Sequence, residues 1–205
     1  LSILLSYWML MTLVPVPGYG PDVLSKDGNL AAYIDRLVLN GHLLSVTYDP
    51  EGLLSTLPSL ATALMGVLAG QLIKSGSEPR EKVGNLLLFG SLSVAIGSLL
   101  NIWFPINKTL WTSSYVAFTG GIALILLAIF FFIIDVSRYV RWASPFTILG
   151  MNSIFTYLLS GILGISFSYT SVPLMFTPWV GPMHGQLIYA LVLLALSGMM
   201  IMAAS

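Results

Sequence analysis

The sequence is a series of long apolar stretches separated by shorter polar ones. A helix needs about 20 apolar residues to cross the hydrocarbon core of a bilayer, where every backbone polar group must be paired within the protein. The pattern therefore predicts an all-α fold, a polytopic transmembrane helix bundle with about six spans. The expected spans cover residues 1–16, 53–73, 83–104, 110–134, 146–166 and 186–204, and residues 17–52 form a long polar loop after the first span.

The composition agrees with a membrane protein. Of the 205 residues, 57% are hydrophobic and 8% are charged, whereas soluble domains have roughly 25% charged residues. From Ala143 to Ser205 there is no Asp, Glu, Lys or Arg, which requires lipid or apolar helices around that stretch. The absence of cysteine excludes disulfides and thiolate metal sites, and a formal net charge of zero gives no support for binding nucleic acid. We therefore expect an integral membrane protein surrounded by the lipid bilayer.

Both ends of the sequence are apolar. The chain begins at Leu1 without the basic segment of a signal peptide, and it stops within the apolar run LVLLALSGMMIMAAS. We expect residues 1–205 to form a single transmembrane domain that is the C-terminal portion of a larger parent protein, whose natural start lies upstream.

Basic residues near span ends favour the cytoplasmic side of a membrane. Most of them would lie on one side here, between the second and third spans or between the fourth and fifth. These residues are Lys74, Arg80, Lys82, Arg138 and Arg141. Assigning that side to the cytoplasm places residues 17–52 outside and both ends of the chain in the cytoplasm. The orientation rule explains these side chains without a ligand, although they could also contact the phosphates of a nucleotide-like cofactor.

Two carboxylates precede the second span on the outer side, in the sequence YDPEG. This sequence is typical of a helix start, with Asp49 as the cap, Pro50 at the first helical position and Glu51 at the positive end of the helix dipole. Alternatively, Asp49 and Glu51 bind a cationic amine or relay a proton at the mouth of the bundle. The two interpretations are compatible.

A second polar group surrounds the short outer loop at residues 105–109. Lys108 and Trp111 are ordinary anchors at a membrane interface. More hydrogen-bonding side chains follow one another here than anchoring needs. We expect a polar pocket lined by Asn107, Trp111 and Ser114, because carbohydrate ligands are bound by a Trp face together with amide and hydroxyl groups.

Two features lie inside expected spans. Asn152 is in the fifth span, where a polar side chain needs a partner; it either bonds to another helix or lines the entry of a cytoplasmic cofactor. Gly66 and Gly70 form a GxxxG pattern on the second span, which favours close packing against another helix.

The remaining polar candidates favour structural roles. Asp35 and Arg36 are adjacent opposite charges in the outer loop, where we expect a structural ion pair or an amphipathic interfacial helix. His42 and His184 are the two histidines, and neither has neighbours at metal-ligand spacing, so no metal site is predicted. The sequence also lacks a nucleophile elbow, a phosphate-binding glycine loop and a dinucleotide fingerprint.

Several segments considered together point to a known family. In order, they are AAYIDRLVL, TYDPEGLLSTLPS followed by GVLAG, FPINKTLWTSSYV, Asp135 and SPFTILGMNSIFTY. This series resembles the C-terminal half of the heparan-alpha-glucosaminide N-acetyltransferase family from about Leu1 to Tyr157. The chain looks like a bacterial homologue, of the kind described as N-acetylglucosamine-related membrane proteins.

The resemblance implies an enzyme of about eleven spans in a bacterial inner membrane. Such an enzyme moves an acetyl group from cytosolic acetyl-CoA to the amine of a glucosamine-type sugar on the outer face, through an acetylated histidine or by direct attack. The family's catalytic histidine lies in its N-terminal half, so this chain would hold no catalytic residue and would be inactive without that missing half. Homo-oligomers are a further expectation. The residues carried over as lining of the acceptor and acetyl-CoA site are Asp49, Glu51, Asn107, Lys108, Trp111 and Asn152.

Two other functions fit the same residues. In an amino-sugar transporter or permease, the outer polar cluster would be a substrate gate. The chain could also be a membrane subunit that scaffolds a partner.

Overall fold

The computed structural model describes residues 2–45, 47–151, 153–154 and 157–158. The chain divides into two compact units, Leu1–Ser137 and Arg138–Ser205, which are treated separately below. The described residues are helical, as predicted, with turns and loops between the helices.

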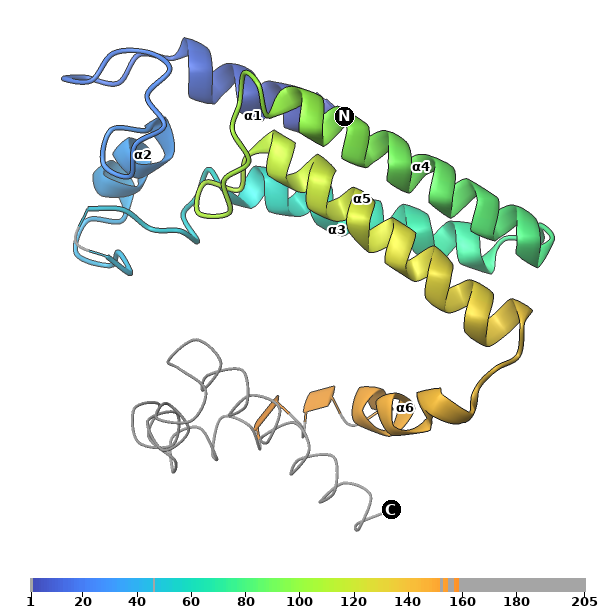
Figure 1. The fold of residues 1–205 in the computed structure, drawn as a ribbon. Coiled ribbons are helices and arrows are strands. Elements are labelled where there is room, and N and C mark those ends of the chain that lie inside the picture. Colours follow the sequence, from blue (N-terminus) through green and yellow to red (C-terminus); the bar gives the residue numbers. More distant parts are fainter. Residues whose placement is uncertain (1, 46, 152, 155–156, 159–205) are drawn as a thin grey trace, which may run out of the picture. The chain divides into compact units, whose positions relative to one another are not determined.

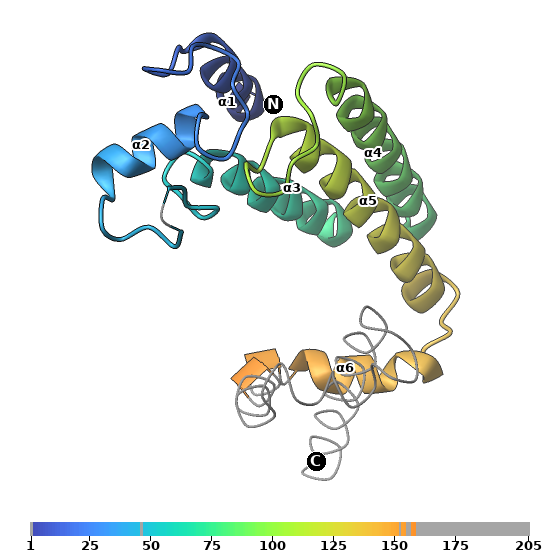
Figure 2. The same cartoon turned by 60° about the vertical axis from the view of Figure 1, so that its left-hand side comes forward.

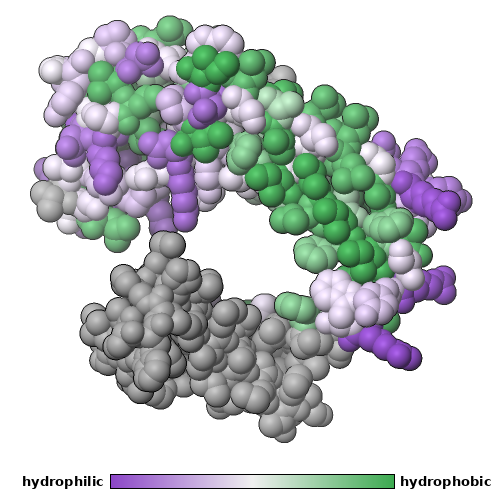
Figure 3. Space-filling view, viewed as in Figure 1, coloured by the Kyte–Doolittle hydropathy of each residue, from purple (hydrophilic) through white to green (hydrophobic). Residues whose placement is uncertain are grey.

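Three helices of the first unit are long and apolar enough to cross a bilayer. They are α3 (Thr56–Lys74), α4 (Pro79–Leu100) and α5 (Ser113–Phe131), which a π-helix extends over Phe132–Val136. Figures 1 and 2 show the three helices running side by side. In Figure 3 apolar side chains cover the helical part of this unit, while polar side chains gather at the helix ends. This distribution is that of an integral membrane protein, with apolar residues facing lipid.

The helix ends differ from the expected span limits by a few residues, for local reasons. Helix α4 already starts at Pro79, because proline is suited to the first turn and the charged residues after it continue the helix. At its other end, α4 stops at Leu100, where the Asn101 side chain accepts a hydrogen bond from the Ile106 backbone N–H and starts the next loop. Hydropathy measures apolar length, so it cannot locate either feature.

The first expected span contains a short helix, the fifth is described in part, and the sixth lies outside the described residues. Helix α1 (Ser2–Leu13) is apolar but shorter than a complete span. In the second unit, a short 3-10 turn at Arg141–Ala143 leads into α6 (Ser144–Met151). The rest of residues 146–166 beyond position 158, and all of 186–204, lie outside the described residues.

The long loop expected at residues 17–52 contains a helix of its own, α2 (Leu30–Val38), in line with the amphipathic alternative given above. The Asn29 side chain caps α2 by accepting a hydrogen bond from the Ala32 N–H. One face of α2 is buried, whereas Leu37 and Val38 are exposed. The buried face joins a core shared by α1, α2 and the loop before α5. This core consists of Tyr7, Met11, Val16, Leu30, Ala31, Phe104 and Leu110.

Helices α4 and α5 pack closely, with glycines at the contact. A Cβ on Gly97 would lie 2.5 Å from the backbone nitrogen of Phe118, and one on Gly121 would lie 2.7 Å from the backbone nitrogen of Val94. Glycine is therefore required for this approach of the two backbones. By contrast, a Cβ on Gly66 or Gly70 of α3 meets no described atom within 4 Å. Among the described helices, close packing thus occurs at α4 and α5 and not at the GxxxG pattern.

Candidate functional site

The two polar motifs lie at the same end of the helices. The DPEG turn comes just before α3 and the NKTLW loop just before α5, and these helices run in the same direction (Figures 1 and 2). Leu54, which follows DPEG, packs against the core that contains Phe104 and Leu110 from the loop before α5. The opposite end of the same helices carries the turn between Lys74 and Pro79.

Asp49 holds a turn and does not cap α3, which corrects the helix-start interpretation. Its Oδ1 accepts a hydrogen bond from the Glu51 N–H at 2.9 Å, and its Oδ2 accepts one from the Leu44 N–H at 3.1 Å. The side-chain bond two residues ahead forms an Asx turn, which competes with the helix for backbone donors. Helix α3 consequently starts only at Thr56. The Glu51 side chain is exposed.

Asp35 lies directly beneath this turn. Its side chain is fully buried, and its Oδ1 accepts a hydrogen bond from the Leu53 N–H at 2.9 Å. Burial raises the pKa of Asp35, as does the neighbouring Asp49, whereas the bond from Leu53 and the charge of Arg36 lower it. Adjacent helix positions point in different directions, and Arg36 donates instead to the Thr47 carbonyl oxygen at 2.8 Å. The expected pairing of Asp35 with Arg36 is thus replaced by two separate contacts, one to Leu53 and one to Thr47.

In the NKTLW loop, Asn107 and Thr112 hold each other and the surrounding backbone. The Asn107 Oδ1 accepts hydrogen bonds from the N–H groups of Thr109 and Leu110. The Asn107 N–H donates to the Thr112 Oγ1 at 3.0 Å, and that hydroxyl donates to the Pro105 carbonyl oxygen. Thr112 also caps α5, because its side chain accepts from the Tyr115 N–H. These bonds fix where α5 begins.

Trp111 ties the same loop to α3. Its backbone has a φ of 52°, in the left-handed region that costs most residues about 1 to 2 kcal/mol. In this conformation the indole Nε1–H donates to the Thr62 Oγ1 at 3.3 Å, and the ring meets Tyr115 edge to face at 5.6 Å between centroids. The indole is only partly buried, so part of its surface is free to contact a ligand.

The other predicted site residues have different surroundings. Lys108 is exposed, while Ser114 is fully buried, with its Oγ 3.1 Å from the Thr112 Oγ1. Asn152 lies outside the described residues. The structure therefore brings Asp49, Glu51 and the 107–114 group to the same end of the helices, and it leaves only part of that group accessible.

Some residues that organise this end were not among the predicted site residues. The buried Tyr7 hydroxyl donates to the Leu110 carbonyl oxygen, and the Ser113 Oγ donates to the Leu4 carbonyl oxygen at 2.6 Å. Thr112 was detectable, since a threonine just before a long apolar run is a helix-start signal. No local pattern identifies the partners of Tyr7 and Ser113, because these contacts join distant parts of the chain.

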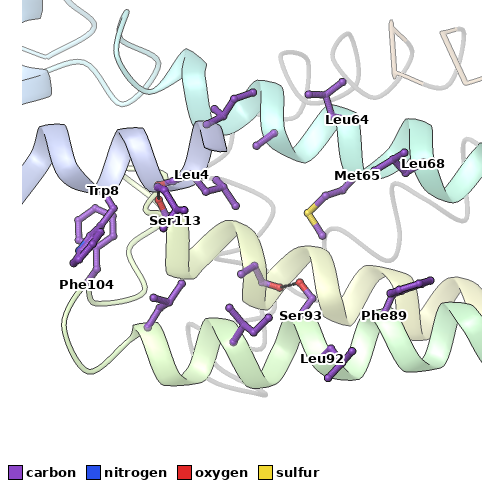
Figure 4. A pocket seen from close by; sticks show the side chains of 16 residues that line it. Leu4, Trp8, Leu64, Met65, Leu68, Phe89, Leu92, Ser93, Phe104 and Ser113 are labelled. Carbon is purple, nitrogen blue, oxygen red and sulfur yellow. Dashed lines mark hydrogen bonds between the residues drawn. The ribbon is translucent and has the colours of Figure 1, made fainter. Parts of the chain in front are cut away.

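A cavity of about 490 Å³ lies between the helices (Figure 4). Its walls come from α1, α3, α4 and α5 and are mostly apolar. The hydroxyls of Ser93 and Ser113 are already bonded to the backbone carbonyls of Ala117 and Leu4. An amino sugar needs many hydrogen-bonding partners, so this cavity does not suit one, and the loop end is the better candidate.

At the opposite end of the helices, the basic residues Lys74, Arg80 and Lys82 surround the turn between α3 and α4. The Lys82 Nζ donates to the Ile73 carbonyl oxygen at 2.8 Å, where a cation complements the negative end of α3. Lys74 and Arg80 are exposed. Their charges are available to anionic lipid headgroups or to the phosphates of a soluble molecule.

Comparison with known proteins adds a family relationship. No family model matches the chain. It is 31% identical to mouse heparan-alpha-glucosaminide N-acetyltransferase over 75% of this chain, and 32% identical to the human protein of the same name over 74%. In each case the match covers 28% of the length of the relative. These identities agree with the motif series of the sequence, and the chain is therefore related to the heparan-alpha-glucosaminide N-acetyltransferases over about three quarters of its length.

Proposed function

We propose that this chain is the C-terminal part of a membrane-bound N-acetyltransferase. The longer enzyme transfers the acetyl group of cytosolic acetyl-CoA to the amine of a glucosamine-type sugar at the outer face of a bacterial inner membrane. The observation that carries the proposal is the location of the DPEG turn and the NKTLW loop at the same end of the helices. The matched relatives, which are named for acetylating a glucosamine, supply the reaction.

The charges at the two ends of the helices suit such a transfer. An amino sugar arrives as an ammonium ion, which the Asp49 and Glu51 carboxylates attract. The half-buried Trp111 provides an apolar ring for a face of the sugar. Acetyl-CoA carries several phosphates, which Lys74 and Arg80 attract at the other end.

The reaction itself is an acyl transfer. A base first takes one proton from the ammonium ion. The neutral amine then attacks the thioester carbonyl, the carbon–sulfur bond breaks, the coenzyme A thiolate leaves, and a second proton passes from the acylated nitrogen to the thiolate. Attack by a histidine first would give an acetylated intermediate and the same overall balance. We assign no catalytic base to this chain, and the proposal places that base in the missing N-terminal half of the parent protein.

We further propose that Asn107, Lys108, Trp111, Ser114 and Asn152 contribute to the walls or the support of the substrate site. Asn107 and Ser114 would act by holding the loop, since their side chains already bond within it. Asn152 would lie on the path to acetyl-CoA. Both ends of this chain would face the cytoplasm, and the parent protein could form homo-oligomers.

The test is reconstitution of the full-length parent protein in liposomes, with acetyl-CoA labelled on its acetyl group and with free glucosamine. We expect labelled N-acetylglucosamine, and its yield should fall at least tenfold in Asp49→Ala, which removes the turn and one carboxylate. Asp27→Ala, an exposed aspartate earlier in the outer loop, is the matched control and should keep the wild-type rate.

The same liposomes separate the rival functions. Unmodified glucosamine that accumulates inside the vesicles, without acetylation, would indicate the transporter. If neither acetylation nor uptake occurs in correctly inserted protein, the enzyme proposal is wrong.

A further inference from the structure

Asp35 is the least expected polar group of the outer region. It lies on the buried face of α2, has 0% exposure, and is the only one of the described acidic residues that is completely buried. Its Oδ2 has no hydrogen-bond partner among the described residues. A buried carboxyl group with a free oxygen destabilises a fold. Stability alone therefore does not explain an acidic residue at this position.

The single hydrogen bond of Asp35 goes to the end of the DPEG turn. The bond from the Leu53 N–H to Oδ1 joins positions 18 residues apart, so it connects α2 to the segment that leads into α3. Asp49 and Glu51 lie immediately before that bond. The buried Asp35 carboxyl group thus holds the end of the turn in place, and the same turn carries the two candidate carboxylates, Asp49 and Glu51.

Gly52 of the turn lies against the same Asp35 carboxyl group. It is buried, and a Cβ at this position would overlap the Asp35 carboxylate, whose three atoms are the nearest atoms to that Cβ. The backbone of the turn therefore passes directly over the carboxyl group, which only glycine allows. Asp35 and Gly52 form a matched pair in which one residue supplies the acceptor and the other supplies the space.

We propose that Asp35 is a positioning residue for the acceptor amine. It acts through the Asp49–Leu53 turn, which its carboxyl group holds over α2 so that the Asp49 and Glu51 carboxylates face an incoming ammonium group. The inference rests on the proposed function for the identity of the acceptor, whereas the link between Asp35 and the turn is independent of it.

The first test measures how accessible the turn is to a labelling reagent and does not depend on enzyme activity. Residues 1–205 contain no cysteine. Ser55→Cys can therefore serve as the single reporter in a full-length protein in which any cysteines outside this segment are replaced by serine. Ser55 is 7% exposed and follows the turn directly. Asp35→Ala should increase maleimide labelling of this reporter roughly tenfold, because the turn loses the acceptor of the hydrogen bond that holds it over α2. Asp35→Asn keeps an acceptor oxygen and should restore protection, and Asp27→Ala should leave labelling unchanged.

The second test is a double-mutant cycle on the matched pair. Gly52→Ala should strongly increase labelling in the wild-type background but have little further effect in Asp35→Ala, because the overlapping carboxylate is gone. Equal labelling of the wild type and Asp35→Ala, or additive effects of the two substitutions, would overturn the link between Asp35 and the turn.

The kinetic test addresses the acceptor. In Asp35→Ala the KM for glucosamine should rise about tenfold, with the KM for acetyl-CoA unchanged, and Asp35→Asn should restore it. An equal rise in both constants would overturn the role in acceptor positioning. If the wild-type protein acetylates no amino sugar, the proposed function fails, and the labelling results alone then decide whether Asp35 holds the turn.

Discussion

At the scale of single residues, polar side chains at the loop end mostly bond to backbone groups. Asp49 accepts from Leu44 and Glu51, and Asn107 accepts from Thr109 and Leu110. The sequence indicated that these residues matter, because polar groups beside a membrane are costly without partners. The prediction that Asp49 caps a helix was wrong, because an Asx turn and a helix cap use the same residue types.

The buried position of Asp35 predicts a pH-dependent stability. Burial raises its pKa in the folded protein above the value of about 3.9 in an unfolded chain. The folded state then holds this proton more tightly, so the contribution of Asp35 to stability is greatest at low pH and falls as pH rises from about 4 through the raised pKa. Thermal unfolding in detergent, compared between wild type and Asp35→Asn, should show a smaller decline with pH in the variant. Parallel curves would contradict the assignment.

Trp111 predicts a coupling between the NKTLW loop and α3. Trp111→Phe keeps an aromatic ring but loses the N–H that donates to Thr62, which should cost about 1 kcal/mol. Thr62→Val should cost a similar amount, and the double variant little more than either alone. Trp103→Phe is the control, since Trp103 is 61% exposed. Thermal unfolding of the four variants measures the coupling, and fully additive losses would exclude it.

At the scale of helices, apolar length located three transmembrane helices well, but it did not give their ends. The ends depend on particular residues, such as Pro79 at the start of α4 and Thr112 at the start of α5. The helix–helix contacts were also not deducible, because a small-residue pattern does not say which partner it meets. In the described residues the glycines of α4 and α5 make the close approach, and Gly66 of α3 does not.

The positions of those glycines predict which Gly→Ala substitutions lower the stability of the protein and which do not. Gly97→Ala and Gly121→Ala place a methyl group against the backbone of the facing helix, so each should lower the unfolding temperature clearly, with a loss of about 1 to 3 kcal/mol. Gly66→Ala introduces the same methyl group on α3, where it meets no described atom within 4 Å, and should have little effect. A loss in Gly66→Ala as large as in Gly97→Ala would instead reveal a helix packed against that face of α3.

At the scale of the whole molecule, the order and direction of the helices determine which groups share an end. The DPEG turn and the NKTLW loop lie at one end of α3 and α5, and Lys74 and Arg80 lie around the turn at the other end. Under the proposed function, the amino sugar and acetyl-CoA would approach these two ends from opposite sides of the membrane. The assignment of one end to the cytoplasm is still a prediction from the basic residues.

This topology predicts a labelling pattern in intact cells. Single cysteines at Glu51 and Lys108 should both react with a membrane-impermeant maleimide added outside, because both side chains are exposed at the same end. A cysteine at Ser77, in the turn between α3 and α4, should react only after the cells are opened. Reaction of Ser77→Cys in intact cells would reverse the proposed orientation. If only one of the cysteines at Glu51 and Lys108 reacted in intact cells, the two motifs would lie on opposite sides of the membrane.

The sequence by itself determined that this protein lies in a membrane, that it is helical and to which enzymes it is related. Apolar length, charge and motif order are properties of the chain alone, and the bilayer leaves few other ways to satisfy its backbone. Only the tertiary structure decided what the polar side chains hold. The partners of Asp35, Trp111 and Tyr7 are Leu53, Thr62 and Leu110, which are distant in sequence and become neighbours only when the helices pack.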